Sequence, residues 1–107
     1  MLNAQTTDTH TAVDDLFGRF GAELFVLQPT ADRIPTVWVA ASHLLDVLSY
    51  LKQSYPMLYD LFAIDERLRD NRQGQPDADF TVVYHLFSFT PVAEFRIKVA
   101  VIEPAET

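Results

Sequence analysis

Residues 79–89 read Asp-Phe-Thr-Val-Val-Tyr-His-Leu-Phe-Ser-Phe, the longest nearly continuous run of apolar and β-branched residues in the chain. No glycine or proline interrupts it, and β-branched and aromatic side chains favour a pleated surface. Because side chains alternate across a strand, Tyr84 and Leu86 lie on one face, and Val83 and Phe87 lie on the other. Both faces are therefore largely apolar. The run predicts a strand inside a sheet, with material packed on both sides.

The composition limits the classes of protein that this chain can belong to. At 107 residues it is one domain by length, and its net charge is -7. This charge repels nucleic acid and anionic membrane surfaces. The chain has no cysteine, so it supplies no disulfide and no thiolate ligand for an iron–sulfur cluster or a zinc ion. No signal peptide or transmembrane run is recognisable, and we expect a soluble, cytosolic protein.

The segment ahead of this strand begins with polar residues 1–10, for which we expect a flexible tail. From Thr11 onward, apolar residues recur at the spacing of one helical face: Val13, Leu16, Phe17 and Phe20. Thr11 is placed to cap this helix, and Gly21 is placed to end it in a left-handed turn.

Two short strands are expected next, at Leu24–Gln28 and Thr36–Ala40. The loop between them holds two prolines and is too short for a crossover, so the strands should pair as an antiparallel hairpin. Ser42 can cap a second helix, which must stop by Tyr55 because a proline follows. The buried face of that helix is expected to carry Leu44, Val47, Leu48 and Leu51.

A third strand, Met57–Ile64, is apolar on both faces except for Asp60. The strand–helix–strand order predicts that the second and third strands run parallel if they share a sheet. The fifth strand, Glu94–Val101, alternates between charged and apolar residues. Its inward face is expected to carry Phe95, Ile97, Val99 and Val101.

Two helices and five strands in the order α-β-β-α-β-β-β predict an α+β fold. We expect a two-layer sandwich in which two helices pack on a mixed five-stranded sheet, formed by residues 11–107 as a single domain. The first two strands pair and the last three can form a meander. Loop lengths leave the remaining strand order open.

The residue types that carry out catalysis are present, but their spacing is not typical of a site. His10, His43 and His85 lack the spacing of metal ligands, and no glycine-rich phosphate loop or serine elbow occurs. We therefore assign no catalytic, cofactor-binding or metal residue. One alternative stays open, in which His85, Tyr84 and Asp60 form an acid–base site of a small α+β enzyme or ligand-binding domain. The other interpretation is that these groups only satisfy hydrogen bonds within the sheet.

The stretch from Asp65 to Pro76 is a charged loop that joins the third strand to the fourth. Its acidic and basic residues nearly cancel, which is typical of a solvated, self-paired loop. Arginine is also enriched at protein interfaces, because its planar fork pairs with carboxylates in two places. The candidate subunit-interface residues are Asp65, Glu66, Arg67, Arg69 and Arg72.

Three sequence blocks carry a resemblance to a known family. They are Met57-Leu-Tyr-Asp-Leu-Phe-Ala-Ile-Asp-Glu-Arg67, then residues 79–88, then Arg96-Ile-Lys-Val99. Together they resemble the C subunit, or 30 kDa subunit, of respiratory NADH:quinone oxidoreductase (complex I), over about residues 13–103. The Asp-Glu-Arg-Leu-Arg run at 65–69 is most similar to bacterial forms in which this subunit is fused to the quinone-site D subunit.

The resemblance implies a structural, docking role in the peripheral arm, which passes electrons from NADH through FMN and iron–sulfur centres to quinone and couples this to proton translocation. It implies no redox centre in this piece, and partners that are the D (49 kDa) subunit and the iron–sulfur subunits. The location it implies is the cytoplasmic side of the bacterial inner membrane, without insertion into the bilayer. On this interpretation the chain itself is not catalytic.

The chain departs from the family at its end. The family continues past the last strand into a segment with Glu-Arg-Glu and then Asp-x-x-Gly, whereas this sequence stops at Thr107. We therefore expect an amino-terminal fragment of a longer subunit. Two other functions stay open at this point, the small enzyme or ligand-binding domain described above and a homodimeric regulatory module.

Overall fold

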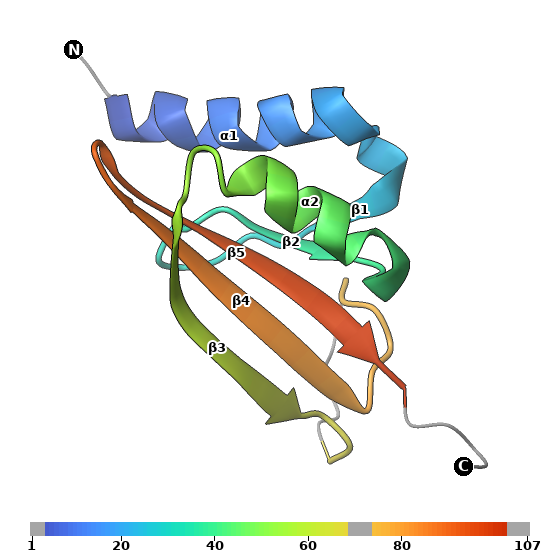
Figure 1. The fold of residues 1–107 in the computed structure, drawn as a ribbon. Helices are drawn as coiled ribbons and strands as arrows, with labels where there is room; N and C mark the ends of the chain where they lie inside the picture. The colour runs from blue at the N-terminus through green and yellow to red at the C-terminus, as the bar shows by residue number, and fades with distance from the viewer. Residues whose placement is uncertain (1–3, 69–73, 103–107) are drawn as a thin grey trace.

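The computed structural model describes residues 4–68 and 74–102. Within these ranges the elements follow the predicted order α-β-β-α-β-β-β, and the predicted α+β fold is confirmed (Figure 1). Short 3₁₀ turns precede the first strand and the second helix, at Ala22–Leu24 and Ala41–His43. The main elements are α1 (Ala4–Phe20), β1 (Phe25–Leu27), β2 (Thr36–Val39), α2 (Leu44–Leu51), β3 (Met57–Asp65), β4 (Phe80–Phe89) and β5 (Val92–Val101).

The five strands form one mixed sheet in the order β1-β2-β5-β4-β3. The predicted hairpin of β1 and β2 and the meander of β3, β4 and β5 are both confirmed, since each of these pairs is antiparallel. The two sets join through a parallel pairing of β2 with β5, in which Val37 lies opposite Ile97. The strands β2 and β3 therefore run in the same direction, as expected, but β5 and β4 lie between them. The outer strands of the sheet are β1 and β3.

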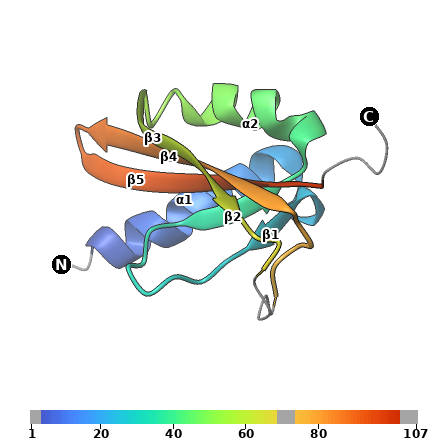
Figure 2. The same cartoon turned by 90° about the horizontal axis from the view of Figure 1, so that it is seen from below.

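The main core lies between the helices and one face of the sheet. On β5 the predicted inward residues Phe95, Ile97 and Val99 are 0 to 3% exposed, whereas Val101 at the end of the strand is 38% exposed. Val47 and Leu51 of α2 are buried against this layer, and Leu44 and Leu48 are partly buried, so the predicted face of α2 is confirmed. Figure 2 shows α2 above the strands. From α1, Val13 and Leu16 join the same cluster.

The start of α1 differs from the prediction. The helix begins at Ala4 and not at Thr11, so Thr11 lies inside it, and residues 4–10 are helical where a tail was expected. No glycine or proline occurs between Ala4 and Thr11, so nothing in the local sequence stops the helix from extending in this direction. The end of α1 is as predicted, because Gly21 has φ 98° and its N–H donates to the Phe17 carbonyl at 2.7 Å.

The predicted cap of α2 is wrong. The 3₁₀ turn Ala41–His43 precedes the helix, so Ser42 lies within this turn, and neither Ala40 nor His43 makes a side-chain capping bond. Similarly, the turn Ala22–Leu24 removes Leu24 from the first strand. In both places a short 3₁₀ turn stands at the start of a helix or strand. Apolar periodicity does not predict such turns.

The opening stretch forms β4, and it lies inside the sheet as predicted, between β5 and β3. Leu86 faces the helices, in line with Phe95 of β5. On the opposite face, Thr81, Val83 and His85 are 0 to 9% exposed, although both helices pack on the other side. The Tyr59 ring lies beside His85, and the Glu66 carboxylate accepts a hydrogen bond from Thr81. Both faces of β4 are therefore largely buried.

Candidate docking site around strand β3

Strand β3 is an outer strand with a mostly apolar and exposed surface. Eight of its nine residues are exposed. The exposed side chains include Met57 (42%), Leu58 (53%), Tyr59 (64%), Leu61 (51%) and Phe62 (40%). Because alternate residues point to opposite faces, this apolar surface wraps around both sides of the strand. An exposed apolar patch of this kind is typical of a surface that binds another protein.

A bulge between Leu58 and Asp60 changes the phase of β3 against β4. It places the Tyr59 ring over the side of β4 that faces away from the helices, where it lies 5.1 Å from the His85 ring and 5.8 Å from the Phe87 ring. Bulges commonly re-aim a side chain at a sheet edge. The result is a continuous aromatic surface that runs from β3 onto β4.

The predicted interface loop begins at the end of β3 with a closed ion pair. Arg67 donates from Nε and Nη2 to the two carboxylate oxygens of Asp65, at 3.0 and 2.7 Å. These two hydrogen bonds, together with one from the Arg67 backbone N–H, lower the pKa of Asp65 from 3.8 to about 2. The Arg67 guanidinium also lies 4.9 Å from the centre of the Phe80 ring. Both side chains of the pair remain about half exposed, so they can also meet a partner.

Glu66 has a different role from its neighbours in this loop. It is 3% exposed, its Oε2 accepts a hydrogen bond from the Thr81 hydroxyl at 2.5 Å, and its backbone N–H donates to the Asp79 carbonyl at 2.8 Å. A buried carboxylate held in this way fixes the base of the loop against β4. The remaining predicted loop residues, Arg69 and Arg72, lie outside the described residues.

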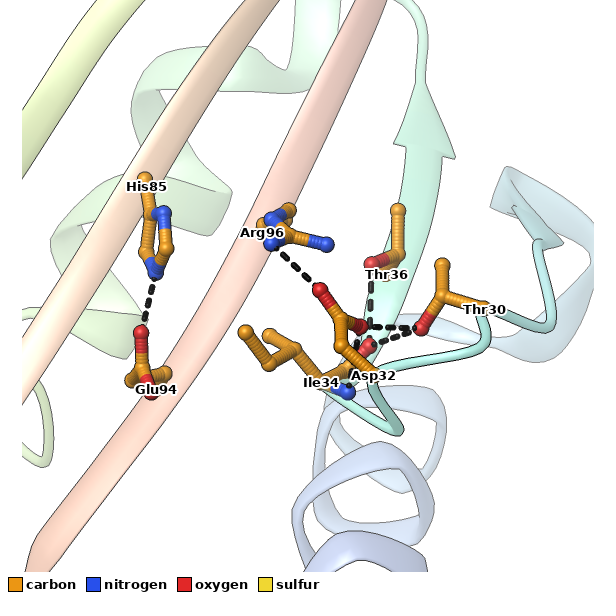
Figure 3. A network of polar contacts seen from close by, with 7 residues as sticks. All are labelled: Thr30, Asp32, Ile34, Thr36, His85, Glu94 and Arg96. Atoms are coloured by element: carbon orange, nitrogen blue, oxygen red, sulfur yellow. Dashed lines mark hydrogen bonds and ion pairs between the residues drawn. The ribbon is translucent and has the colours of Figure 1, made fainter.

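The alternative acid–base site is not assembled. Tyr84 packs against the core on the helix side, whereas His85 lies on the opposite face of β4. Asp60 lies opposite His85 in the strand register, but its carboxylate accepts the backbone N–H of Leu61 at 2.9 Å. The partner of His85 is Glu94 of β5, with 2.6 Å between His85 Nε2 and Glu94 Oε1 (Figure 3). Sequence pattern alone does not reveal Glu94 as this partner, because the diagonal contact depends on the register of the β4–β5 hairpin.

A second polar network on this face joins residues that are far apart in the sequence. Asp32, in the loop between β1 and β2, accepts a hydrogen bond from Arg96 Nη2 at 2.7 Å and another from the Thr30 hydroxyl at 2.7 Å (Figure 3). These two contacts hold the pKa of Asp32 well below its usual range, and the hydrogen bond from Arg96 has the larger effect. The only signal in the sequence is a short Thr-Ala-Asp turn between two prolines. The network ties this loop to β5.

The other features of the described residues do not suggest a catalytic centre. Among the side chains described for residues 12–68 and 74–102, no three His, Asp or Glu residues gather as they would around a metal ion. A cavity of about 450 Å³ lies between α1 and the β1–β2 loop, lined by Val13, Phe17 and Ile34 among others. Its volume is in the range of small-molecule sites. However, Asp60, Tyr84 and His85 are not among its lining residues. No helix in the described part of the chain is long and apolar enough to cross a membrane.

Comparisons with known proteins show which family the chain is similar to. Residues 37–107 match the family model described as "Respiratory-chain NADH dehydrogenase, 30 Kd subunit". The matched segment begins in β2 and includes α2, all of β3, and the β4–β5 hairpin.

Curated relatives are named as the fused C/D subunit of NADH-quinone oxidoreductase. The chain is 60% identical over 82 residues to that of Psychrobacter cryohalolentis, an alignment that covers 74% of this chain and 14% of the relative. It is 48% identical over 99 residues to that of Pseudomonas aeruginosa, covering 90% of this chain and 17% of the relative. The chain therefore spans only about a sixth of the length of these relatives.

A solved structure described as "Nqo5 of the trypsin-resistant fragment (1-134)" has the same fold. The TM-score is 0.66, and the alignment covers 88% of this chain and 70% of that chain. Sequence identity is 16%, so this likeness concerns the fold alone.

Proposed function

The chain belongs to the family of the 30 kDa subunit of respiratory-chain NADH dehydrogenase, and from this membership we propose that it is a structural docking domain in the peripheral arm of that complex. In this role it binds neighbouring subunits and carries out no chemistry itself. The complex passes electrons from NADH through FMN and iron–sulfur centres to quinone, coupled to proton translocation. The domain sits on the cytoplasmic side of the bacterial inner membrane.

The principal partner in this proposal is the D subunit. The curated relatives are named as C/D chains, and this chain aligns with only 14 to 17% of their length. A fused arrangement holds the two parts at high effective concentration, which favours a contact between them. The iron–sulfur subunits are the other proposed neighbours. The chain contains no cysteine, so the clusters take their thiolates from other subunits.

The observation that carries the proposal is the exposed apolar surface of β3. Met57, Leu58 and Leu61 are 42, 53 and 51% exposed on an outer strand. Burying one such side chain at an interface contributes about 1.5 to 3 kcal/mol relative to full exposure. A free protein would gain nothing from this exposure, whereas a component of a larger assembly uses it for binding.

The charged loop after β3 extends the proposed interface. Asp65, Glu66, Arg67, Arg69 and Arg72 make up the candidate contact residues, with Glu66 fixing the base of the loop and Arg67 half exposed beside Phe80. Rim charges of this kind steer association and set orientation more than they add affinity.

Charge reversal tests the loop. Arg67, Arg69 and Arg72 are changed together to Glu, and incorporation into the complex is measured by native gel electrophoresis and by co-purification with the D subunit. We expect at least a tenfold loss of incorporation, because three cations at a contact become anions.

The matched control changes Arg19, Arg33 and Lys52 to Glu. It alters the net charge by the same amount, at exposed positions outside the loop. Normal incorporation of the control and loss of the loop variant would support the loop as a contact. Normal incorporation of both would remove the loop from the interface. Failure of the unaltered protein to co-purify with the D subunit would overturn the docking function itself.

A further inference from the structure

The outer edge of β3 has the features of a strand that another strand can join. It is nine residues long, which is about 30 Å at the usual rise per residue, and it is the last strand in the sheet. Natural edge strands are usually protected by shortness, by lysines or by proline. Met57–Asp65 contains neither lysine nor proline, and its charged residues are Asp60 and Asp65.

The hydrogen bonds define which backbone groups of β3 point outward. Glu66, next after the strand, donates its N–H to Asp79 at the start of β4. From Asp60 to Asp65 the pairing with β4 has no register shift. In an antiparallel pair every second residue turns its N–H and C=O toward the partner strand. The backbone N–H and C=O groups of Ile64 and Phe62 therefore point toward β4. Those of Asp65, Ala63 and Leu61 point outward, away from the sheet.

A side-chain contact agrees with this phase. The Leu61 N–H donates to the Asp60 carboxylate at 2.9 Å and not to a group on β4. The outward N–H of Leu61 is thus bonded to the neighbouring Asp60 side chain, and a carbonyl of a partner strand can take the place of this side chain. Local bonds between a side chain and a neighbouring backbone group compete with sheet pairing in this way.

We propose that the outer edge of β3, from Leu61 to Asp65, binds an extended segment of the D subunit by strand addition. The inference rests on the proposed docking function and specifies its mode. The backbone of the added strand pairs with the outward groups of Leu61, Ala63 and Asp65. Its side chains are apolar on both faces, matching Leu61 on the helix side and Phe62 on the other, and a Lys or Arg meets the Asp60 carboxylate.

Two features argue for the D subunit as the occupant. Most of the length of the C/D relatives lies outside the segment that this chain matches, so in those relatives a long D part is covalently joined to the domain that this chain matches. In addition, β5 and β3 end at the same end of the sheet, since Asp65 pairs with Phe80 and Phe80 pairs with Val101. At about 4.8 Å per strand spacing, the last residue of β5 is about 10 Å from Asp65. A chain that continues from β5 is close to the proposed edge.

Site-specific cross-linking identifies the occupant. p-Benzoylphenylalanine is placed at Leu61 of this protein in the assembled complex, and at Leu45 of α2 as a control that is 78% exposed. Light is expected to produce an adduct with the D subunit from position 61 and not from position 45. An adduct with a second copy of this chain, or only with another component of the complex, would overturn the proposal.

A backbone change tests the mode of binding. Ala63→Pro removes an outward N–H without removing a bond to β4, and prolines are tolerated at this kind of edge position. Ala63→Val keeps the N–H and is the matched control, because Ala63 is exposed. We expect at least a fivefold loss of association with the D subunit for the proline variant and none for the valine variant. Thermal melts of both chains verify folding.

Hydrogen exchange provides a readout that does not depend on any variant. The amides of Ala63 and Asp65 should exchange quickly in the isolated chain and become protected in the complex, whereas those of Phe62 and Ile64 are protected in both. Equal exchange of Ala63 and Asp65 in the two states would refute strand addition. Association of Ala63→Pro at the unaltered level would refute the edge contact and leave the docking function standing, whereas no association of the unaltered chain would refute both.

Discussion

The two outer strands of the sheet differ in length, burial and surroundings. β1 has three residues, and its Phe25 is 8% exposed and stacks on Phe17 of α1 with ring centres 5.2 Å apart. The loop after β1 is tied to β5 by Asp32 and Arg96. β3 has nine residues, and eight of them are exposed. Val26 and Leu27 of β1 are 41 and 51% exposed, so this edge also shows apolar side chains, but over a much shorter length than β3. The greater length of exposed apolar strand is the reason for proposing β3, and not β1, as the docking edge.

The largest loss of stability is expected when a charge is placed at the centre of the sheet, in comparison with the same charge at its apolar edge. Val99 of β5 is 3% exposed, so Val99→Asp loses about 1.5 to 3 kcal/mol of apolar burial and adds several kcal/mol for a buried carboxylate. This sum is comparable with the whole stability of a small domain. We expect no cooperative unfolding transition in thermal melts followed by circular dichroism.

The matched change on β3 is Leu58→Asp. Leu58 is 53% exposed, so we expect the free energy of unfolding to change by about 1 kcal/mol or less. A melting temperature for Val99→Asp within a degree or two of the unaltered chain would contradict the burial assigned to β5. A Leu58→Asp chain that fails to fold would show that β3 supports the fold as strongly as β5 does.

Much of the fold was predictable because apolar periodicity records burial within one element. The clean alternation of β5 identified Phe95, Ile97 and Val99, and the short proline-containing loop identified the β1–β2 hairpin. The family resemblance was also correct. The parallel pairing of β2 with β5 was not predictable, because it joins segments far apart in the sequence, with Val37 opposite Ile97 and no connecting turn between them.

The candidate site was harder to predict because exposure depends on neighbours. An apolar strand such as Met57–Asp65 has the same pattern whether it is central or at an edge, so its exposure was visible only in the structure. The pairing of His85 with Glu94 depends on hairpin register, and that of Asp32 with Arg96 depends on a loop that folds back over the sheet. Ion pairs between residues close in the sequence are easier to predict, and Asp65 and Arg67 are only two residues apart.

A smaller effect is expected at the β1 edge. Asp32→Ala removes the contacts to Arg96 and Thr30, and the Asp32 side chain is 46% exposed, so the loss of stability is about 1 kcal/mol or less. Faster amide exchange is expected in Phe25–Leu27 and in the loop, with β3 unchanged. Asp77→Ala removes the same charge at an exposed position and is the control. Equal exchange of β1 in both variants would mean that the ion pair does not hold this edge closed.

The smallest effect concerns the charge pair that ends β3. Hydrogen bonds from Arg67 lower the pKa of Asp65 to about 2, so the stabilisation from this pair is present above the unfolded-state pKa near 3.8. It is lost as the pH falls from about 4 through about 2. In the unaltered chain, the carboxyl carbon of Asp65 should titrate near pH 2 by NMR. In Arg67→Gln the midpoint should rise toward the ordinary value of about 3.9.

A matched variant separates this pair from general charge effects. Arg33→Gln removes the same charge from an exposed loop position and should leave the Asp65 midpoint unchanged. A midpoint that stays near 2 in Arg67→Gln would mean that other groups hold the carboxylate. Because both side chains are about half exposed and screened by water, the pair orders the end of β3 more than it stabilises the domain. The charged end of β3 thus remains ordered at neutral pH, next to the edge proposed to bind the D subunit.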